Sequence, residues 1–203
     1  MKFKIGDATD TALCIVLKHE FLRCEDSFND FAESAKIMIM QGENRRIAYK
    51  TYNAYARFIH HLYEFMMSAI ARDRQNTEQL PAEMADKYIA SHTQRNLTNR
   101  REAILNGTAP AWENHISFYP EKIPDTFAKE FRQFRNKVSA HASYERSDLS
   151  LSDFYEKNHK YLGLLYFDAK SWWGRLEDEF PDLKEITSFS VLIKDIPPSK
   201  LWV

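Results

Sequence analysis

The stretch RNKVSAH places an arginine, an asparagine and a histidine within one short segment of the chain. Arg135 is followed directly by Asn136, and five residues separate Arg135 from His141. An arginine guanidinium stays charged in proteins and offers a planar fork of N–H donors to a phosphate. A histidine has an ordinary pKa of about 6.5 and can therefore transfer a proton near neutral pH. Together these residue types suit a site that holds one phosphate and moves a proton.

The motif continues an apolar stripe that is typical of one long helix. The stripe repeats at spacings of 4, 3 and 4 residues and consists of Phe127, Phe131, Phe134 and Val138. His141 extends it by three positions. A histidine at the apolar edge of a helix is more often a hydrogen-bonded core residue than a catalytic one, and isolated arginines are usually solvated surface charges. The motif by itself therefore leaves both a core residue and a site open.

Three other segments show sustained helical periodicity, namely residues 10–40, 44–73 and 152–179. The helix that carries Arg135 is expected to begin near residues 124–125. Because amphipathic helices must bury their apolar faces against one another, we expect an all-α fold. Its core would be an antiparallel bundle of four long helices, with a polar helical and loop insertion between the second and third helices.

Residues at the ends of these helices predict where they begin and stop. Thr9 or Asp10 is expected to cap the first helix, and Gly42 to end it. Ser150 or Ser152 is expected to cap the fourth helix. These short polar side chains accept hydrogen bonds from the unpaired N–H groups of the first turn, whereas glycine tolerates the backbone angles that end a helix.

The whole chain, residues 1–203, is expected to form a single domain. Within it, the insertion covers about residues 75–123 and includes a possible helix at about 80–105. Because this segment is rich in polar residues, we expect either a solvated helix or a mobile insertion. A C-terminal tail covers about residues 181–203. Its run from residue 189 to residue 193 is expected to be β-like.

Composition excludes several functional classes. The net charge of −1 argues against a broad basic surface for duplex nucleic acid. With only 5 glycines the chain has no Gly-rich phosphate loop. Cys14 and Cys24 lie about 15 Å apart on one helix, too far for a disulfide. The start of the chain has no signal-peptide pattern and no apolar run is long enough for a membrane span, so we expect a cytoplasmic protein that does not engage a membrane.

A metal centre or another cofactor is not expected. A di-iron bundle needs two Glu-x-x-His pairs, and the chain offers one, Glu156 with His159. The neighbours His60 and His61 point about 100° apart on a helix and cannot both face a bundle interior. No serine or cysteine lies in the strand–turn–helix context of an activated nucleophile.

The segment Arg135–Asn136 followed by His141 resembles the motif of the HEPN superfamily. That motif is an arginine and a histidine separated by four to six residues, often with asparagine after the arginine, on a late helix of a bundle. The small residue before the histidine and the continuation AHASYERSD also resemble abortive-infection members of the family. The resemblance implies a metal-independent endoribonuclease in which the 2′-hydroxyl of RNA attacks its own phosphate. His141 would be the acid/base, Arg135 the phosphate clamp and Asn136 a hydrogen-bonding orienter.

Further residues are candidates for supporting this site. Glu64, on the second helix, could orient Arg135, because inward carboxylates need a partner; an exposed helix charge is an equal alternative. Arg132 and Lys137 would add positive potential. Tyr144 follows His141 by three residues, whereas antitoxin-regulated family members carry their modified tyrosine two residues after the histidine, so regulation by an antitoxin protein stays open.

Geometry constrains how Arg135 and His141 can act together. Six α-helical residues rotate the chain by about 240°, so the two side chains do not share one helix face. Either the helix breaks near Ser139 and Ala140, or the site combines residues of two subunits. The resemblance implies the second arrangement, a homodimer with the motifs facing each other across an interface cleft.

Three hypotheses remain for the function. The first is a HEPN-type ribonuclease, the toxin or effector of a toxin–antitoxin or phage-defence system, with RNA as substrate. The second is a non-catalytic HEPN-like module that binds a nucleotide or a protein through the insertion. The third is a helical dimerisation scaffold without a ligand. An exposed Arg135–His141 cluster favours the first hypothesis, and a buried, fully hydrogen-bonded His141 favours the third.

Overall fold

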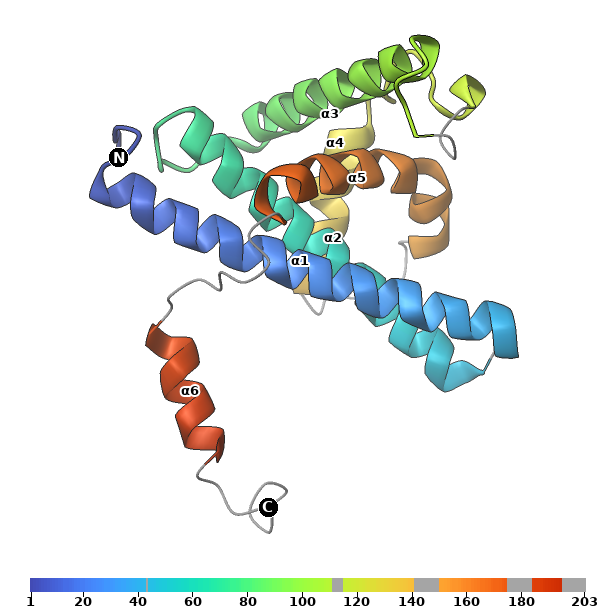
Figure 1. The fold of residues 1–203 in the computed structure, drawn as a ribbon, viewed down its shortest axis with the longest axis horizontal. Helices are drawn as coiled ribbons and strands as arrows, with labels where there is room; N and C mark the ends of the chain where they lie inside the picture. The colour runs from blue at the N-terminus through green and yellow to red at the C-terminus, as the bar shows by residue number, and fades with distance from the viewer. Residues whose placement is uncertain (43, 111–114, 141–149, 175–183, 195–203) are drawn as a thin grey trace.

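Two long helices, α1 (Ala8–Gln41) and α2 (Arg45–Asp73), form a hairpin along the length of the molecule (Figure 1). The computed structural model describes residues 1–42, 44–110, 115–140, 150–174 and 184–194. Gly42 ends α1 with a φ of 87°, a conformation that glycine adopts without strain, and this confirms the predicted stop. The apolar stripes of the two helices meet, as where Phe21 packs edge-on against Phe65 with ring centroids 6.0 Å apart.

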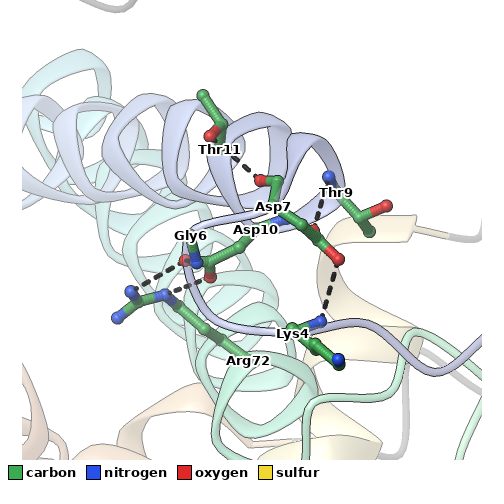
Figure 2. Close-up of polar contacts among 7 residues, drawn as sticks. All are labelled: Lys4, Gly6, Asp7, Thr9, Asp10, Thr11 and Arg72. Atoms are coloured by element: carbon green, nitrogen blue, oxygen red, sulfur yellow. Dashed lines mark hydrogen bonds and ion pairs between the residues drawn. The ribbon is translucent and has the colours of Figure 1, made fainter.

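The start of α1 is fixed by Asp7, and the prediction of Thr9 or Asp10 as the cap is wrong (Figure 2). The Asp7 carboxylate accepts hydrogen bonds from the backbone N–H groups of Thr9 (2.8 Å) and Asp10 (2.9 Å). Asp10 serves another purpose, because its carboxylate accepts from Nε of Arg72 at 2.8 Å and from the Gly6 N–H at 2.9 Å. This ion pair ties the beginning of α1 to the end of α2.

Helix α3 (Ala82–Leu105) occupies much of the predicted insertion, but it is part of the core. One residue per turn is buried along the face that meets α4 and α5: Ala85, Ile89, Thr93 and Leu97. The expectation of a solvated helix is therefore wrong. It failed because a narrow stripe of four residues is enough to dock a helix whose other faces are polar.

The segment of the motif folds as α4 (Phe127–Phe134) and continues directly as the π-helix η3 (Arg135–Ala140). Phe127, Phe131 and Phe134 are buried, in agreement with the predicted stripe. The short 3₁₀-helix η2 (Ile116–Phe118) lies between α3 and α4 in the chain. The chain thus changes its helical geometry at Arg135, where the motif begins. A π-helix is wider than an α-helix and often occurs at functional sites.

Helix α5 (Leu151–Trp173) lies between α3 and the α1–α2 hairpin (Figure 1). Of the two predicted caps, Ser150 is used: its hydroxyl accepts the Asp153 N–H at 3.0 Å. The helix ends at Trp173 and not near residue 179 as predicted. Its end is stabilised by Lys18, whose Nζ donates to the Trp173 carbonyl at 2.6 Å and satisfies a group that the helix leaves unpaired.

The last described element is α6 (Lys184–Lys194). The predicted β-like run at residues 189–193 lies within this helix, so that prediction is wrong. The run carries apolar residues at both helical and strand spacings, and short apolar runs of this kind are ambiguous. Across the described residues the fold is all-helical, with one isolated β-bridge between Lys2 and Asn76. The assignment to a single domain stays a prediction.

Candidate functional site

Arg135 stands at the junction of α4 and η3, next to α2. The burial of Phe131 and Phe134 fixes the orientation of α4 and so carries the Arg135 side chain to the edge of the core. That side chain is 27% exposed, so it is partly accessible to solvent. The local fold thus presents the Arg135 cation at the edge of the core, between α2 and η3.

The Arg135 guanidinium is held by two side chains. Its Nε donates to Oε1 of Glu64 at 2.6 Å, and Nη2 contacts the same oxygen. Its Nη1 donates to Oδ1 of Asn136 at 2.9 Å. The guanidinium carbon also lies 5.8 Å from the centre of the Tyr63 ring, within cation–π range. Because all three guanidinium nitrogens contact Glu64 or Asn136, the side chain of Arg135 is oriented before any ligand binds.

Glu64 comes from α2, 71 residues earlier in the chain than Arg135. Its side chain is 32% exposed, so it is neither a buried carboxylate nor a fully solvated one. The pair leaves the local charge close to neutral, and a phosphate arriving here would share the guanidinium with Glu64. The structure therefore brings together three of the predicted residues: Arg135, Asn136 and Glu64.

Arg132 belongs to a separate interaction. Its Nε and Nη2 donate to the two carboxylate oxygens of Asp86 on α3, each at 2.8 Å. This bidentate pair raises the pKa of Arg132 and fastens α4 to α3. Asp86 therefore neutralises the positive charge that Arg132 was expected to add to the site. Lys137 lies on η3 and is partly exposed.

His141 and Tyr144 lie outside the described residues. The helix that leads to His141 is described as far as Ala140, and Ser139 and Ala140 belong to the π-helix. The change of helical geometry falls at Arg135, four residues before the position where a break was expected. The roles of His141 and Tyr144 stay predictions.

His60, which the sequence suggested only as an unlikely metal ligand, lies near Arg135. His60 precedes Glu64 by one turn on the same face of α2. Its Nδ1 is buried and has no hydrogen-bond partner among the described residues, and burial, with smaller contributions from His61 and Arg135, lowers its pKa. Its neighbour His61 is paired instead with Glu20, at 2.9 Å. The four-residue spacing of His60 and Glu64 in HHLYE places both side chains on one helix face, and this sequence signal could have identified His60 as a neighbour of the site.

The histidine of the single Glu-x-x-His pair, His159, is partly buried among aromatic side chains. His159 Nδ1 and the Tyr55 hydroxyl form a hydrogen bond of 3.0 Å, and the His159 ring stacks on Tyr155 at 4.4 Å. Burial lowers the pKa of His159 to about 4. Glu156 is exposed. Within the described ranges no group of three His, Cys, Asp or Glu side chains is arranged to hold a metal ion.

A cavity of about 750 Å³ lies between α2, α3 and α5, apart from Arg135. On its wall Arg95 donates to Nδ1 of His92 at 2.8 Å, which leaves Nε2 of His92 to donate to Asp168 at 3.0 Å. Arg72, also on the wall, is paired with Asp10. Of the charged side chains on the wall, Arg72 pairs with Asp10 and Asp168 with His92, so these groups favour no particular ligand.

No protein-family model, curated protein or solved structure matches this chain. None of the described helices is long and apolar enough to cross a lipid bilayer. The features of the chain that bear on its function are the side chains around Arg135 and the motif that contains it.

Proposed function

We propose that the chain is a metal-independent endoribonuclease of the HEPN type. The observation that carries the proposal is the Arg135 guanidinium, which is oriented by Glu64 and Asn136 and belongs to a side chain that is 27% exposed. It lies on the π-helix that leads toward His141. A fixed cation beside a proton-transferring imidazole is the arrangement that phosphodiester cleavage by an internal hydroxyl requires.

In the proposed reaction the RNA 2′-oxygen forms a bond to the adjacent phosphorus while the bond from phosphorus to the 5′-oxygen breaks. A base accepts the 2′-hydroxyl proton and an acid supplies a proton to the leaving 5′-oxygen, so the proton count balances. His141 performs one of these transfers. Arg135 binds the non-bridging oxygens, on which charge increases in the transition state. Asn136 and Glu64 are positioning residues, because they act on the Arg135 side chain.

The proposal includes an arrangement of helices and subunits. Helices α1, α2, α4 with η3, and α5 would form the four-helix antiparallel core of a HEPN bundle, with α3 added on one side. Two copies would face each other so that both motifs line one cleft. Arg135 of one copy could then act together with His141 of the other, although the two residues do not share one helix face within a chain. The protein would act in the cytoplasm, either as the toxin of a toxin–antitoxin system or as a phage-defence effector, and control by an antitoxin protein stays open.

A second candidate is a non-catalytic HEPN-like module that binds a nucleotide or protein partner. One observation favours it: Glu64 already neutralises Arg135, so the guanidinium would have to share its donors with a phosphate. A structural ion pair between α2 and η3 would look the same. Enzyme and binding module differ in whether Arg135 and His141 change the rate of a reaction.

The test is RNA cleavage by the purified chain in the presence of EDTA. We expect wild type to cut a mixed RNA pool, and Arg135→Ala and His141→Ala to lose at least about 10²-fold in rate, the usual effect of removing one transition-state donor. Arg57→Ala is the matched control, because Arg57 forms a similar but exposed ion pair with Asp30. Far-UV circular dichroism checks that each variant is folded. If wild type leaves every RNA intact but binds a nucleotide through Arg135, the binding module is the better hypothesis.

A further inference from the structure

Helix α6 has an apolar face that nothing in the described structure covers. The helix stands apart from the other helices (Figure 1), and none of its residues is buried. Four large apolar side chains lie on one side of it, at spacings of 3, 3 and 1 residues: Ile186, Phe189, Leu192 and Ile193. All four are exposed, and Phe189 is 62% exposed.

Such a helix needs a surface to pack on. An isolated helix shorter than about 12–15 residues is marginal in water even for good helix formers, and α6 has 11 residues with several β-branched ones. Most helical stability in proteins comes from packing an amphipathic face. The apolar face of α6 is therefore a contact surface.

The same chain carries an apolar groove at the other end of the molecule. It has a volume of about 660 Å³ and lies between the end of α1, the beginning of α2 and the beginning of α5. The lining is mostly apolar or aromatic: Phe31, Ala35, Met38, Ile39, Thr51, Tyr52, Tyr55, Leu151, Ser152, Tyr155 and Glu156. Ile39, on its rim, is 82% exposed.

The groove is hard to reach for the α6 of the same chain. Helix α5 ends at Trp173, whereas the groove begins at Tyr155, and 18 helical residues span about 27 Å. Ten Cα-to-Cα steps from Gly174 to Lys184 span at most about 33–36 Å. The chain would have to cover about 27 Å of this span along α5 and then still lay α6 across the groove. For the groove of a second copy, the distance from Gly174 depends on how the two copies pack and not on the length of α5.

We propose that two copies of the chain exchange their α6 helices, each helix binding in the groove of the other copy. The inference rests on α6 and the groove and uses none of the residues of the ribonuclease proposal. A helix of this length is about 16 Å long and about 10 Å wide, so half of its side surface has an accessible area of about 300 Å². Counting both surfaces, each contact buries about 600 Å² and a reciprocal pair about 1,200 Å², which reaches the range of stable interfaces. A single contact does not.

Symmetry agrees with this arrangement. Reciprocal exchange of an identical element closes a two-fold dimer and leaves neither apolar surface open.

The experiment is sedimentation velocity of the full chain over a concentration series, with three single variants. Phe189→Asp changes the apolar face of α6 and Ile39→Asp changes the groove. Val191→Asp is the matched control, since Val191 lies on the opposite face of the same helix and is also exposed, at 53%. All three side chains are exposed, so circular dichroism should show unchanged helix content.

We expect wild type to dimerise, and Phe189→Asp and Ile39→Asp each to weaken dimerisation at least about tenfold, while Val191→Asp changes it less than about twofold. An equimolar mixture of Phe189→Asp and Ile39→Asp should associate more tightly than either variant alone, because one intact helix then meets one intact groove. A monomeric wild type, an undiminished Phe189→Asp dimer, or a mixture no tighter than its components would each overturn the proposal. A wild-type monomer in which the amides of α6 are protected from hydrogen exchange would also overturn the proposal, because α6 would then be bound within its own chain.

Discussion

The ion pair between Glu64 and Arg135 should stabilise the fold measurably as well as orient the arginine. The two side chains are 32% and 27% exposed, and Arg135 contacts the carboxylate through two nitrogens. Exposed pairs contribute about 0–1 kcal/mol, whereas breaking a fully buried pair costs about 3–5 kcal/mol. This pair lies between the two classes, so we expect a coupling free energy of about 1–2 kcal/mol.

A double-mutant cycle measures this coupling. The variants are Glu64→Gln, Arg135→Gln and the double substitution, each unfolded with urea. The control cycle uses Asp30→Asn and Arg57→Gln, a pair with a distance of 2.8 Å but side chains 45% and 54% exposed. We expect the control coupling to stay below about 0.5 kcal/mol. A Glu64–Arg135 coupling no larger than the control would refute the argument that partial burial strengthens this pair.

The same variants separate positioning from binding of the phosphate. Glu64→Gln leaves the guanidinium in place and keeps its bond to Asn136, so under the ribonuclease proposal it should reduce cleavage less than Arg135→Gln does. A larger loss with Glu64→Gln than with Arg135→Gln, in folded protein, would contradict the assignment of Arg135 as the phosphate clamp.

Three further predictions concern stability. Burial lowers the pKa of His159 from 6.5 to about 4, so between these pH values the unfolded chain binds a proton at His159 and the folded chain does not. The contribution of neutral His159 to stability is therefore complete above about pH 6.5 and is lost as the pH falls toward 4. Urea unfolding at pH 7 and pH 5 should thus show a loss about 2 kcal/mol larger for wild type than for His159→Gln, and equal losses would refute the cause. Leu162→Ala, at a fully buried position, should lower the free energy of unfolding by about 2–5 kcal/mol, and a loss below about 1 kcal/mol would speak against close packing there. Ser150→Ala should cost about 1 kcal/mol through the lost cap of α5, while Ser152→Ala, as control, should change stability little.

Much of the helical architecture follows from local pattern. The stripes of α1 and α2 repeat over many turns, and a pattern of that length has one structural solution. Gly42 and Ser150 act locally through their own backbone angle or hydroxyl group, so they were predictable as helix ends. The stripe of Phe127, Phe131 and Phe134 likewise predicted the buried face of α4.

Other features depend on partners far away in the chain. Asp7 caps α1 while Asp10 binds Arg72, 62 residues later, and no local pattern distinguishes these two aspartates. Helix α5 ends where Lys18, 155 residues earlier, satisfies its last carbonyl. Helix α3 looked solvated because four buried residues among polar ones give a weak periodic signal.

The candidate site divides in the same way. The sequence by itself determined that an arginine, an asparagine and a histidine stand at a spacing suited to phosphate chemistry, since spacing is a property of the chain. Only the tertiary structure decided that Arg135 is held by Glu64 while Arg132, one turn away, is held by Asp86. The physical reason is that ion pairs depend on distance in space, and burial of the aromatic stripe of α4 sets which arginine faces α2 and which faces α3.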